Sequence, residues 1–433
     1  MSPFANKLGT ASRGGFALVR RASPLLFAST MGTGAISILF YTFPYGRNTR
    51  PLLILSVATF LLNLVLFVLF SILCVLRYIY NPGTWKALLD HPVLSMYSGC
   101  FPMAGTTLIN VATDVIHNHY GLGGKGFLYF VWSMWWLDVV ISVVCCWGVV
   151  HLMKTRQLHS LDTMTAGWLL PVVTLTVAAS SGGVLARSLE KYSPLHALIS
   201  ATFAVFMVGV GLTLALMILT VYLLRLIVHG LPQGGTIMSA FLPLGPTAQS
   251  GFAVLLIGQN FQSLLPYNSN SPDFLSSTVA GEVIYVICTC ISFFLWSLAS
   301  MWIVFAVLGI QHVARKTSVP FRLAFWGLVF PNGVYANLTI QLSDVFDSKF
   351  FRIYGSIYAI CTLLLWVYMV IRSLFHLNAF LRRVQLDSES NPRELRSTDR
   401  SHCSTDMERG ISKERPESEG PQGSGKTSVT NVS

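Results

Sequence analysis

The sequence predicts an all-α integral membrane protein with ten transmembrane helices. Hydrophobic residues make up 53% of the chain and charged residues only 11%, whereas soluble domains carry about 25% charged residues. Long apolar runs, many of twenty residues or more, recur between Pro24 and Leu377, and about twenty apolar residues cross the hydrocarbon core as a helix. The sequence does not show the ten-residue alternating strands of a membrane barrel.

The predicted spans are separated by short polar or turn-rich stretches. They are expected at residues 24–43, 52–76, 93–115, 126–152, 164–185, 195–224, 238–261, 279–313, 321–342 and 350–377. The chain is therefore expected to have an amino-terminal segment (1–23), a ten-helix transmembrane domain (24–377) and a tail (378–433). The tail is rich in Ser, Glu, Arg, Pro and Gly, so it is expected to be disordered.

The distribution of lysine and arginine predicts the orientation in the membrane. With the amino terminus in the cytosol, the inner loops and adjoining helix ends hold fifteen of these residues and the outer ones hold seven. Cytosolic loops carry the excess of positive charge in membrane proteins, so both termini are expected in the cytosol. The same asymmetry explains the net charge of +11. The charge therefore gives no reason to expect a nucleic-acid partner, and the expected partner is the lipid bilayer.

Helix-breaking residues follow a regular order along the chain. Every interior proline falls in an odd-numbered span: Pro102, Pro171, Pro243, Pro246 and Pro331. The first span has none but contains Gly32-Thr33-Gly34. Proline has no backbone N–H, so the helix carbonyl that would accept from it loses its hydrogen bond. Inside a membrane such a carbonyl is tolerated only where protein or water supplies another donor. Five broken helices are therefore expected inside, around a central pore, with five straight helices outside as partners in helical hairpins. The alternative is that transmembrane helices are simply richer in Gly and Pro.

Several short motifs resemble one known family. They are residues 31–37 (MGTGAIS), 43–45 (FPY), 99–103 (GCFPM), 135–138 (WWLD), 170–173 (LPVV), 178–183 (AASSGG), 244–246 (LGP) and 325–331 (FWGLVFP). In this order they resemble the tellurite-resistance and dicarboxylate transporter family, which includes the slow anion channels. The motifs are closest to the fungal sulfite efflux pumps, whereas residues 81–84 (NPGT) and 91–93 (HPV) are more similar to the malic acid transporters.

The resemblance implies a function and an assembly. It implies transport of a small inorganic or organic anion across the plasma membrane by a homotrimer with one pore per subunit. The expected substrate is sulfite or bisulfite, moving outward. A C4-dicarboxylate such as malate is the alternative, and a transporter-derived membrane sensor is a more remote one. The resemblance also implies that Phe330, beside Pro331, is the aromatic gate of the pore.

The odd-numbered spans supply the residues expected to line that pore. Their centres contain no Lys or Arg, so selectivity is expected from backbone N–H groups, helix ends, hydroxyls and amides. The candidates are Gly32, Thr33, Gly34, Phe101, Pro102, Thr106, Pro171, Ser180, Gly182, Pro243, Gly245, Pro246, Gln249, Pro331 and Asn332. Each polar member can instead bond a neighbouring helix.

Two acidic residues lie inside or beside predicted spans. Asp138 is near the middle of the fourth, where a carboxylate is expensive and suggests a function, and Glu282 is near the outer end of the eighth. Either can be a proton-coupling site. A structural role, such as a bond from the Trp135 or Trp136 indole to Asp138, is favoured for Asp138 because even-numbered spans lie away from the expected pore. The sequence shows no catalytic constellation, no cofactor motif and no metal-ligand spacing beyond the isolated pair His117 and His119, so neither an enzyme nor a cofactor is expected.

Overall fold

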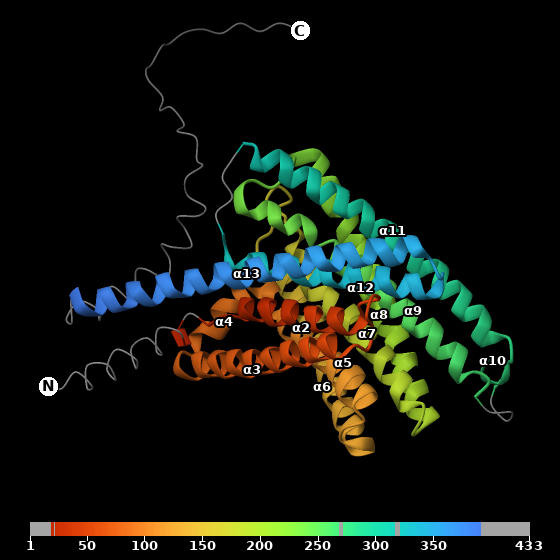
Figure 1. The fold of residues 1–433 in the computed structure, drawn as a ribbon. Helices are drawn as coiled ribbons and strands as arrows, with labels where there is room; N and C mark the ends of the chain where they lie inside the picture. The colour runs from red at the N-terminus through yellow and green to blue at the C-terminus, as the bar shows by residue number, and fades with distance from the viewer. Residues whose placement is uncertain (1–18, 21, 268–271, 317–320, 391–433) are drawn as a thin grey trace, which may run out of the picture. The chain divides into compact units, whose positions relative to one another are not determined.

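The computed structural model describes residues 19–20, 22–267, 272–316 and 321–390, and every regular element among them is a helix (Figure 1). Long helices are linked by short turns and 3₁₀ segments. The elements, in chain order, are η1 (Pro24–Leu26), α2 (Phe27–Thr42), α3 (Arg50–Tyr80), α4 (Gly83–Asp90), η2 (Ser95–Gly99), α5 (Cys100–Val111), η3 (Ala112–His119), α6 (Gly124–Thr155), η4 (Ala166–Leu169), α7 (Leu170–Leu189), α8 (Pro194–His229), η5 (Gly234–Phe241), α9 (Leu244–Leu264), α10 (Asp273–Ser276), α11 (Ala280–Ala314), η6 (Leu323–Leu328), α12 (Val329–Val345) and α13 (Lys349–Ser390).

The chain divides into two units. Gly15–Leu377 forms the helical body, which holds every site discussed below. The other unit comprises Met1–Gly14 and Asn378–Ser433, and residues 378–390 are its only described part. Helix α13 continues through these thirteen residues to Ser390. Extending an existing helix costs far less than starting one, and the disorder expected of the tail stays a prediction. The remainder of the predicted tail and most of the predicted amino-terminal segment lie outside the described residues.

Eight helical segments among the described residues are long and apolar enough to cross a membrane, so the chain is a multi-pass membrane protein. Two of the ten expected spans, 93–115 and 321–342, are not among the eight. The first corresponds to the 12-residue α5 followed by the 8-residue π-helical η3, and the second to the 17-residue α12. Counted with its preceding 3₁₀ segment, α5 has only 17 residues. Helix α12 with η6 has 23, but it contains two asparagines, Asn332 and Asn337, which lower its hydropathy.

Five helices form a closed ring. Helix α2 packs against α5, α5 against α7, α7 against α9, α9 against α12, and α12 against α2. Ring helices are almost wholly buried: 19 of the 20 residues of α7 and 18 of the 21 of α9. By contrast, α3 buries only 6 of its 31 residues. The odd-numbered spans of the sequence are thus the inner helices of the bundle.

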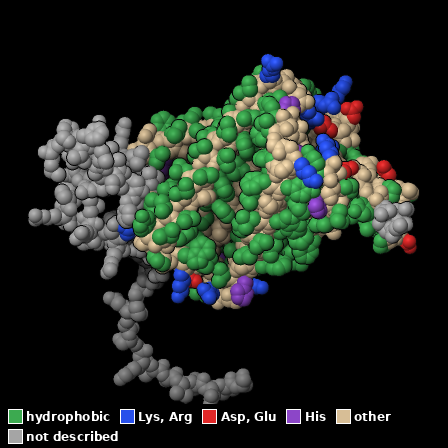
Figure 2. Space-filling model, turned by 90° about the horizontal axis from the view of Figure 1, so that it is seen from below, with side chains coloured by type: hydrophobic (Ala, Val, Ile, Leu, Met, Phe, Trp, Pro, Cys, Tyr) green, Lys and Arg blue, Asp and Glu red, His purple; other side chains and the backbone are tan. Residues whose placement is uncertain are grey.

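The long helices outside the ring bury one narrow stripe each. In α8 the buried positions include Ala197, Ala201, Ala204, Gly211 and Ala215, which recur every three to four residues and let α8 approach α7 closely. Of its other 25 residues, 16 are exposed, and ten of these are large hydrophobic residues. The face shown in Figure 2 is largely hydrophobic, with charged side chains gathered toward its edges. Exposed apolar surface of this extent fits contact with lipid rather than with water.

The prolines of the ring begin helices rather than kink them in the middle. Pro102, Pro171, Pro246 and Pro331 each lie within the first three residues of their α-helix, and Pro243 caps α9. A 3₁₀ segment precedes each of these helices. Proline is tolerated in the first turn because its missing N–H would have no intrahelical partner there. The break predicted in each of these spans is therefore a 3₁₀-to-α junction near one end of the ring.

Helix α2 departs from the predicted pattern of breaks, because it is continuous across Gly32 and Gly34. These two glycines allow close packing instead. A Cβ on Gly32 would lie 3.0 Å from Val329 Cβ of α12, and a Cβ on Gly34 would lie 2.0 Å from Thr107 Oγ1 of α5. The two positions therefore bring α2 into contact with both of its neighbours in the ring.

Candidate functional site

The ring encloses a small cavity that all five of its helices line. Its volume is about 30 Å³, which holds one or two water molecules. The lining residues are Ala35 and Ile38 of α2, Thr107 and Asn110 of α5, Val177 of α7, Gln249 and Phe252 of α9, and Phe330, Gly333, Val334 and Asn337 of α12. The space is too small for an anion with its hydration shell, so the ring is closed at this level.

Two phenylalanine rings form part of the cavity wall. Phe330, the predicted gate, is 4% exposed, and Phe252 on α9 is 9% exposed. Phe252 was not predicted to be part of the site. The sequence spacing could have identified Phe252, because it follows Gln249 by three residues and therefore lies on the same side of a helix.

Amide groups are the most polar part of the lining. The Gln249 side-chain nitrogen donates to the Ser180 hydroxyl at 2.5 Å, and Ser180 donates to the Val177 carbonyl at 2.8 Å. Ser180 is thus linked to the cavity through Gln249. Ser180 and Gln249 were both predicted to belong to the pore.

Asn110 and Asn337 face the cavity from α5 and α12, and no sequence pattern singled them out. They are 7% and 5% exposed. Their Oδ1 atoms are buried without a hydrogen-bond partner. Their amide nitrogens make no hydrogen bond to the described residues and, unlike the oxygens, keep some accessible surface. Two amide N–H₂ groups therefore remain able to donate to whatever occupies the cavity.

The cavity wall carries no charged side chain among its described lining residues. Its remaining polar side chain, Thr107, donates to the Ala104 carbonyl at 2.8 Å and accepts from Asn63 Nδ2 of α3 at 3.2 Å. An ion here would meet only neutral dipoles. Such a site binds weakly enough to let an ion leave again.

Several predicted pore residues instead contact the helices outside the ring. Thr33 Oγ1 accepts from the Trp366 indole of α13 at 3.1 Å. Asn332 donates to the Leu328 carbonyl at 2.7 Å and its Oδ1 accepts from the Tyr358 hydroxyl of α13 at 2.5 Å. These contacts fasten α2 and α12 to α13, away from the cavity.

Two more predicted pore residues face the helices α3 and α6. The Phe101 ring stacks on Phe67 of α3 at 5.4 Å. A Cβ on Gly182 would lie 2.6 Å from Trp135 of α6, whose indole donates to the Ala178 carbonyl at 2.9 Å.

Most of the remaining predicted residues lie near the starts of the ring helices, whereas Thr106 lies in the middle of α5. A Cβ on Gly245 would be 3.9 Å from Val173 and 4.0 Å from Pro331, so α7, α9 and α12 converge there. Thr106 is buried and donates to the Met103 carbonyl at 2.7 Å. Pro102, Pro171, Pro243 and Pro246 begin or cap their helices, as described above.

Asp138 lies on α6 with its carboxylate toward the ring helix α5. It is 6% exposed, accepts from the Ser142 hydroxyl at 3.5 Å, and its Oδ1 would be 3.1 Å from a Cβ on Gly105. The proposed bond from an indole is not present, since Trp135 donates to Ala178. No salt bridge to Asp138 occurs within the described part of the chain. Glu282 is exposed and accepts from Gln262 Nε2 at 3.1 Å.

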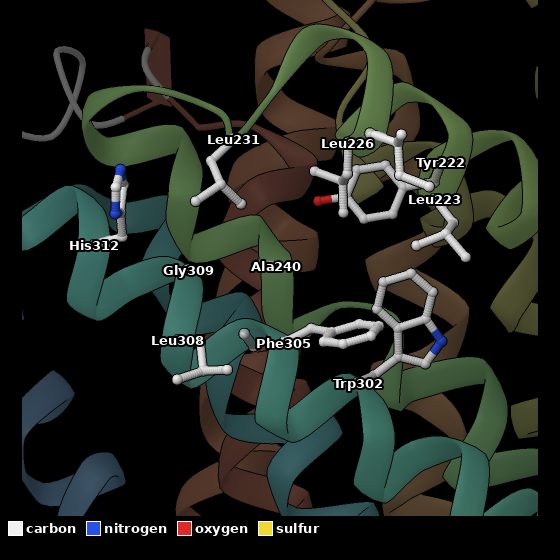
Figure 3. A pocket seen from close by; sticks show the side chains of 12 residues that line it. Tyr222, Leu223, Leu226, Leu231, Ala240, Trp302, Phe305, Leu308, Gly309 and His312 are labelled. Carbon is white, nitrogen blue, oxygen red and sulfur yellow. The ribbon is translucent and has the colours of Figure 1, made fainter.

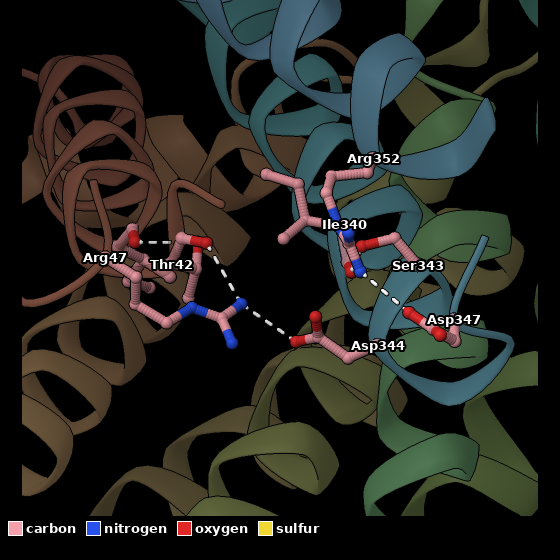
Figure 4. Close-up of polar contacts among 8 residues, drawn as sticks. Thr42, Arg47, Ile340, Ser343, Asp344, Asp347 and Arg352 are labelled. Atoms are coloured by element: carbon pink, nitrogen blue, oxygen red, sulfur yellow. Dashed lines mark hydrogen bonds and ion pairs between the residues drawn. The ribbon is translucent and has the colours of Figure 1, made fainter. Parts of the chain in front are cut away.

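Two ion pairs lie where α2 and α12 end (Figure 4). Arg47 donates to Asp344 at 2.8 Å and to the Thr42 carbonyl at 3.4 Å, so it links the carboxyl ends of α2 and α12. Arg352 pairs with Asp347 at 3.0 Å. Neither pair was predicted, and Arg47 and Asp344 are 297 residues apart in sequence. No group of three or more metal-ligand side chains occurs within the described ranges.

Comparison with known proteins places this arrangement in one family. Residues 21–374 match the family described as SLAC1, voltage-dependent anion channel. The chain is 36% identical over 344 residues to the sulfite efflux pump SSU1 of Trichophyton rubrum, covering 79% of this chain and 88% of that protein. It is 24% identical over 358 residues to the malic acid transport protein of Schizosaccharomyces pombe (80% and 77%), and 27% identical over 326 residues to an uncharacterized transporter of Methanocaldococcus jannaschii (74% and 84%). The motifs therefore predicted the family correctly, and the chain belongs to the voltage-dependent anion channel family.

Proposed function

We propose that this protein exports sulfite or bisulfite across the plasma membrane through a pore along the axis of the ring. The observation that carries the proposal is the cavity lined by α2, α5, α7, α9 and α12, whose polar side chains are neutral and include two free amide donors. Its similarity to the fungal sulfite efflux pumps supports the substrate.

A pore along the axis of the ring requires that α5 and α12, the two ring helices not counted among the eight spans, also cross the membrane. Helix α12 has 17 residues and η6 has 6, which together give about 38 Å at 1.5 and 2.0 Å per residue. The 12 residues of α5 and the 5 of the preceding η2 give about 28 Å on the same basis, before η3 is counted. Both lengths match a hydrocarbon core of about 30 Å. We therefore propose ten spans in five hairpins, with both termini in the cytosol.

Phe330 and Phe252 are proposed to close the pore. The cavity between them holds at most one or two waters, so an ion can pass only when a ring moves aside. Both rings are carried by helices whose 3₁₀-to-α junctions lie near one end of the ring. Of the residues predicted to line the pore, we retain Gln249 and Ser180 beside the cavity and Gly245 and Pro331 where the ring helices converge.

Asn110 and Asn337 are proposed to coordinate the ion as it passes. Each can donate through an amide nitrogen in a site shielded from bulk water, where a hydrogen bond to a charged group contributes about 1.5–3 kcal/mol. Replacing either residue by leucine is expected to lower sulfite flux about tenfold or more. The membrane potential, inside negative, assists export of an anion by about 2.3 kcal/mol per charge per 100 mV.

Malate is the second candidate substrate, supported by the similarity to the malic acid transport protein. A dicarboxylate is larger and, fully ionised, carries two charges, so it would need more donors than the lining offers. The absence of any charged side chain among the described lining residues favours the smaller ion. A transporter-derived sensor would bind an anion without conducting it.

Asp138 is proposed to be structural, because it faces α5 outside the cavity and has Ser142 as its bonding partner. Glu282 is exposed at the start of α11, away from the cavity, so no coupling role is assigned to it. The family resemblance supports a homotrimer, and chemical cross-linking in native membranes tests it. No enzymatic activity and no cofactor are proposed.

Flux from proteoliposomes tests the proposed function. Purified protein is reconstituted at equal density as wild type, Asn337→Leu, or Asn118→Leu, a control at an exposed asparagine outside the cavity. Sulfite and malate release are then measured under an imposed potential. Sulfite release that falls in Asn337→Leu alone supports the proposal. Release of malate without sulfite assigns the dicarboxylate function, and release of neither ion supports the sensor.

A further inference from the structure

A second, larger cavity lies outside the ring, between α8, η5 and α11 (Figure 3). Its volume is about 360 Å³, within the range of pockets that hold small organic molecules. Ile227 and Leu308 of its wall are 74% and 56% exposed. Because these residues belong to helices outside the ring, the cavity opens on the surface that faces lipid.

The wall of this cavity is apolar and aromatic. Trp302 and Tyr222 stack on each other with centroids 5.9 Å apart and an interplanar angle of 29°, and Phe305 packs edge-on against Trp302. The described lining contains no Lys, Arg, Asp or Glu, and His312 is its one titratable side chain other than Tyr222. A charged lipid headgroup would therefore find no countercharge among these residues.

Two polar atoms in the wall have no partner. The Tyr222 hydroxyl and the Trp302 Nε1 make no hydrogen bond, although the residues are only 0% and 2% exposed. The Ser239 hydroxyl of η5 donates to the Thr236 carbonyl at 2.8 Å and makes no hydrogen bond with Tyr222. Figure 3 shows the Tyr222 hydroxyl pointing toward the side of the pocket where Leu231 lies. A buried hydroxyl without a partner is unfavourable, and a hydrogen bond to a bound hydroxyl would remove that cost.

We propose that this cavity binds a membrane sterol. A sterol is a rigid apolar body with flat faces and one hydroxyl, which matches an apolar wall with stacked rings and one buried, unpaired hydroxyl. An acyl chain would fill the space but leave Tyr222 unpaired. Leu219, Tyr222 and Arg225 also have the spacing suggested for sterol contact, a pattern too common to carry the proposal by itself.

The position of the cavity connects the sterol to the pore. Ala240 of the cavity wall belongs to η5, and η5 leads through Leu242 and Pro243 directly into α9, which carries Gln249 and Phe252. A bound sterol that restricts the motion of η5 also restricts the motion of the first turn of the ring helix α9.

Photolabelling of the full-length protein tests sterol binding independently of transport. Protein in phosphatidylcholine vesicles is labelled with a diazirine-bearing cholesterol analogue, with and without excess cholesterol, and the labelled peptides are identified by mass spectrometry. The expected result is saturable labelling of peptides from α8, η5 or α11. Gly309→Phe fills the cavity, since its Cβ would already lie 3.3 Å from Leu231, and is expected to abolish the saturable labelling. Gly209→Phe on α8, with no atom within 4 Å of its Cβ, is the matched control and should label as the wild type does.

Tyr222→Phe tests the hydrogen bond itself. This variant is expected to bind the analogue about fivefold more weakly, and cholestane, which lacks the hydroxyl, should compete equally well in the variant and the wild type. Labelling that cholesterol does not displace, or that is spread evenly over the outer helices, would overturn the proposal. Equal labelling by a photoreactive phosphatidylcholine would assign the cavity to an acyl chain, and a cross-link to a second copy would assign it to the oligomer interface; either result refutes the sterol.

Discussion

The packing of Gly34 allows a sharp test of the ring. In Gly34→Ala the new Cβ would lie 2.0 Å from Thr107 Oγ1, 2.4 Å from Thr107 Cβ and 2.8 Å from Asn63 Nδ2. Ordinary contact begins at 3.4 Å, so the approach to the Thr107 Cβ is 1.0 Å too close. A Cβ is fixed to the backbone and cannot swing away, so α2 and α5 must separate. Overpacking of this kind costs about 1–3 kcal/mol, and the Asn63–Thr107 hydrogen bond would be strained as well.

Thermal unfolding in detergent measures the effect. A thiol-reactive dye reports unfolding as the labelling gained above that of the exposed Cys290 and Cys361, because Cys74, Cys100 and Cys146 are buried. Gly34→Ala is expected to unfold at a temperature several degrees below that of the wild type. The control is Gly148→Ala on α6, which has no atom within 4 Å of the new Cβ. It should match the wild type or gain about 0.5–1 kcal/mol from the higher helix propensity of alanine. Equal stability of the two variants would refute the close approach of α2 and α5.

Three further predictions concern residues outside the cavity. Arg47→Gln, which breaks the exposed pair with Asp344, should change the free energy of unfolding by less than about 1 kcal/mol, and a double-mutant cycle measures the coupling; a larger value would show that the pair is more than a surface contact. Tyr358→Phe removes the hydroxyl that donates to Asn332 Oδ1 at 2.5 Å and should lower the free energy of unfolding by about 1–2 kcal/mol. Thermal unfolding measures the loss, and an unchanged stability would show that Asn332 does not accept this hydrogen bond. Asp138→Asn should keep sulfite flux and its pH dependence in proteoliposomes, whereas loss of that pH dependence would assign proton coupling to the carboxylate.

The sequence predicted the layered arrangement because proline and hydrophobicity report it directly. Proline disrupts a lipid-facing helix, so its confinement to alternate spans distinguished inner from outer helices. The same prolines were interpreted as breaks inside the inner helices, whereas in α5, α7, α9 and α12 they lie in the first turn or at the cap. The prolines did not show that a 3₁₀-to-α junction lies at each of these positions. The glycines did not show that α2 is continuous across Gly32 and Gly34, because glycine can serve either a helix break or close helix packing.

The composition of the site was harder to predict than the fold. Which face of a buried helix points to the axis depends on its rotation, and a helix such as α7, buried on all sides, shows no amphipathic pattern from which to read that rotation. Thr33 and Asn332 therefore looked like pore residues, although they bond to α13. Asn110 and Asn337 gave no local signal, since their importance lies in lacking partners, which only the packing reveals.

The most direct test of the central claim is sulfite flux through a variant of the proposed gate. Phe330→Ala is compared in proteoliposomes with the wild type and with Phe294→Ala, a phenylalanine of α11 that is 67% exposed and outside the cavity. If the ring encloses an anion pore closed by Phe330, sulfite flux through Phe330→Ala should exceed that of both other proteins, which should be equal. Equal flux through all three correctly folded proteins would contradict the account, because it would show that sulfite does not pass the cavity at Phe330.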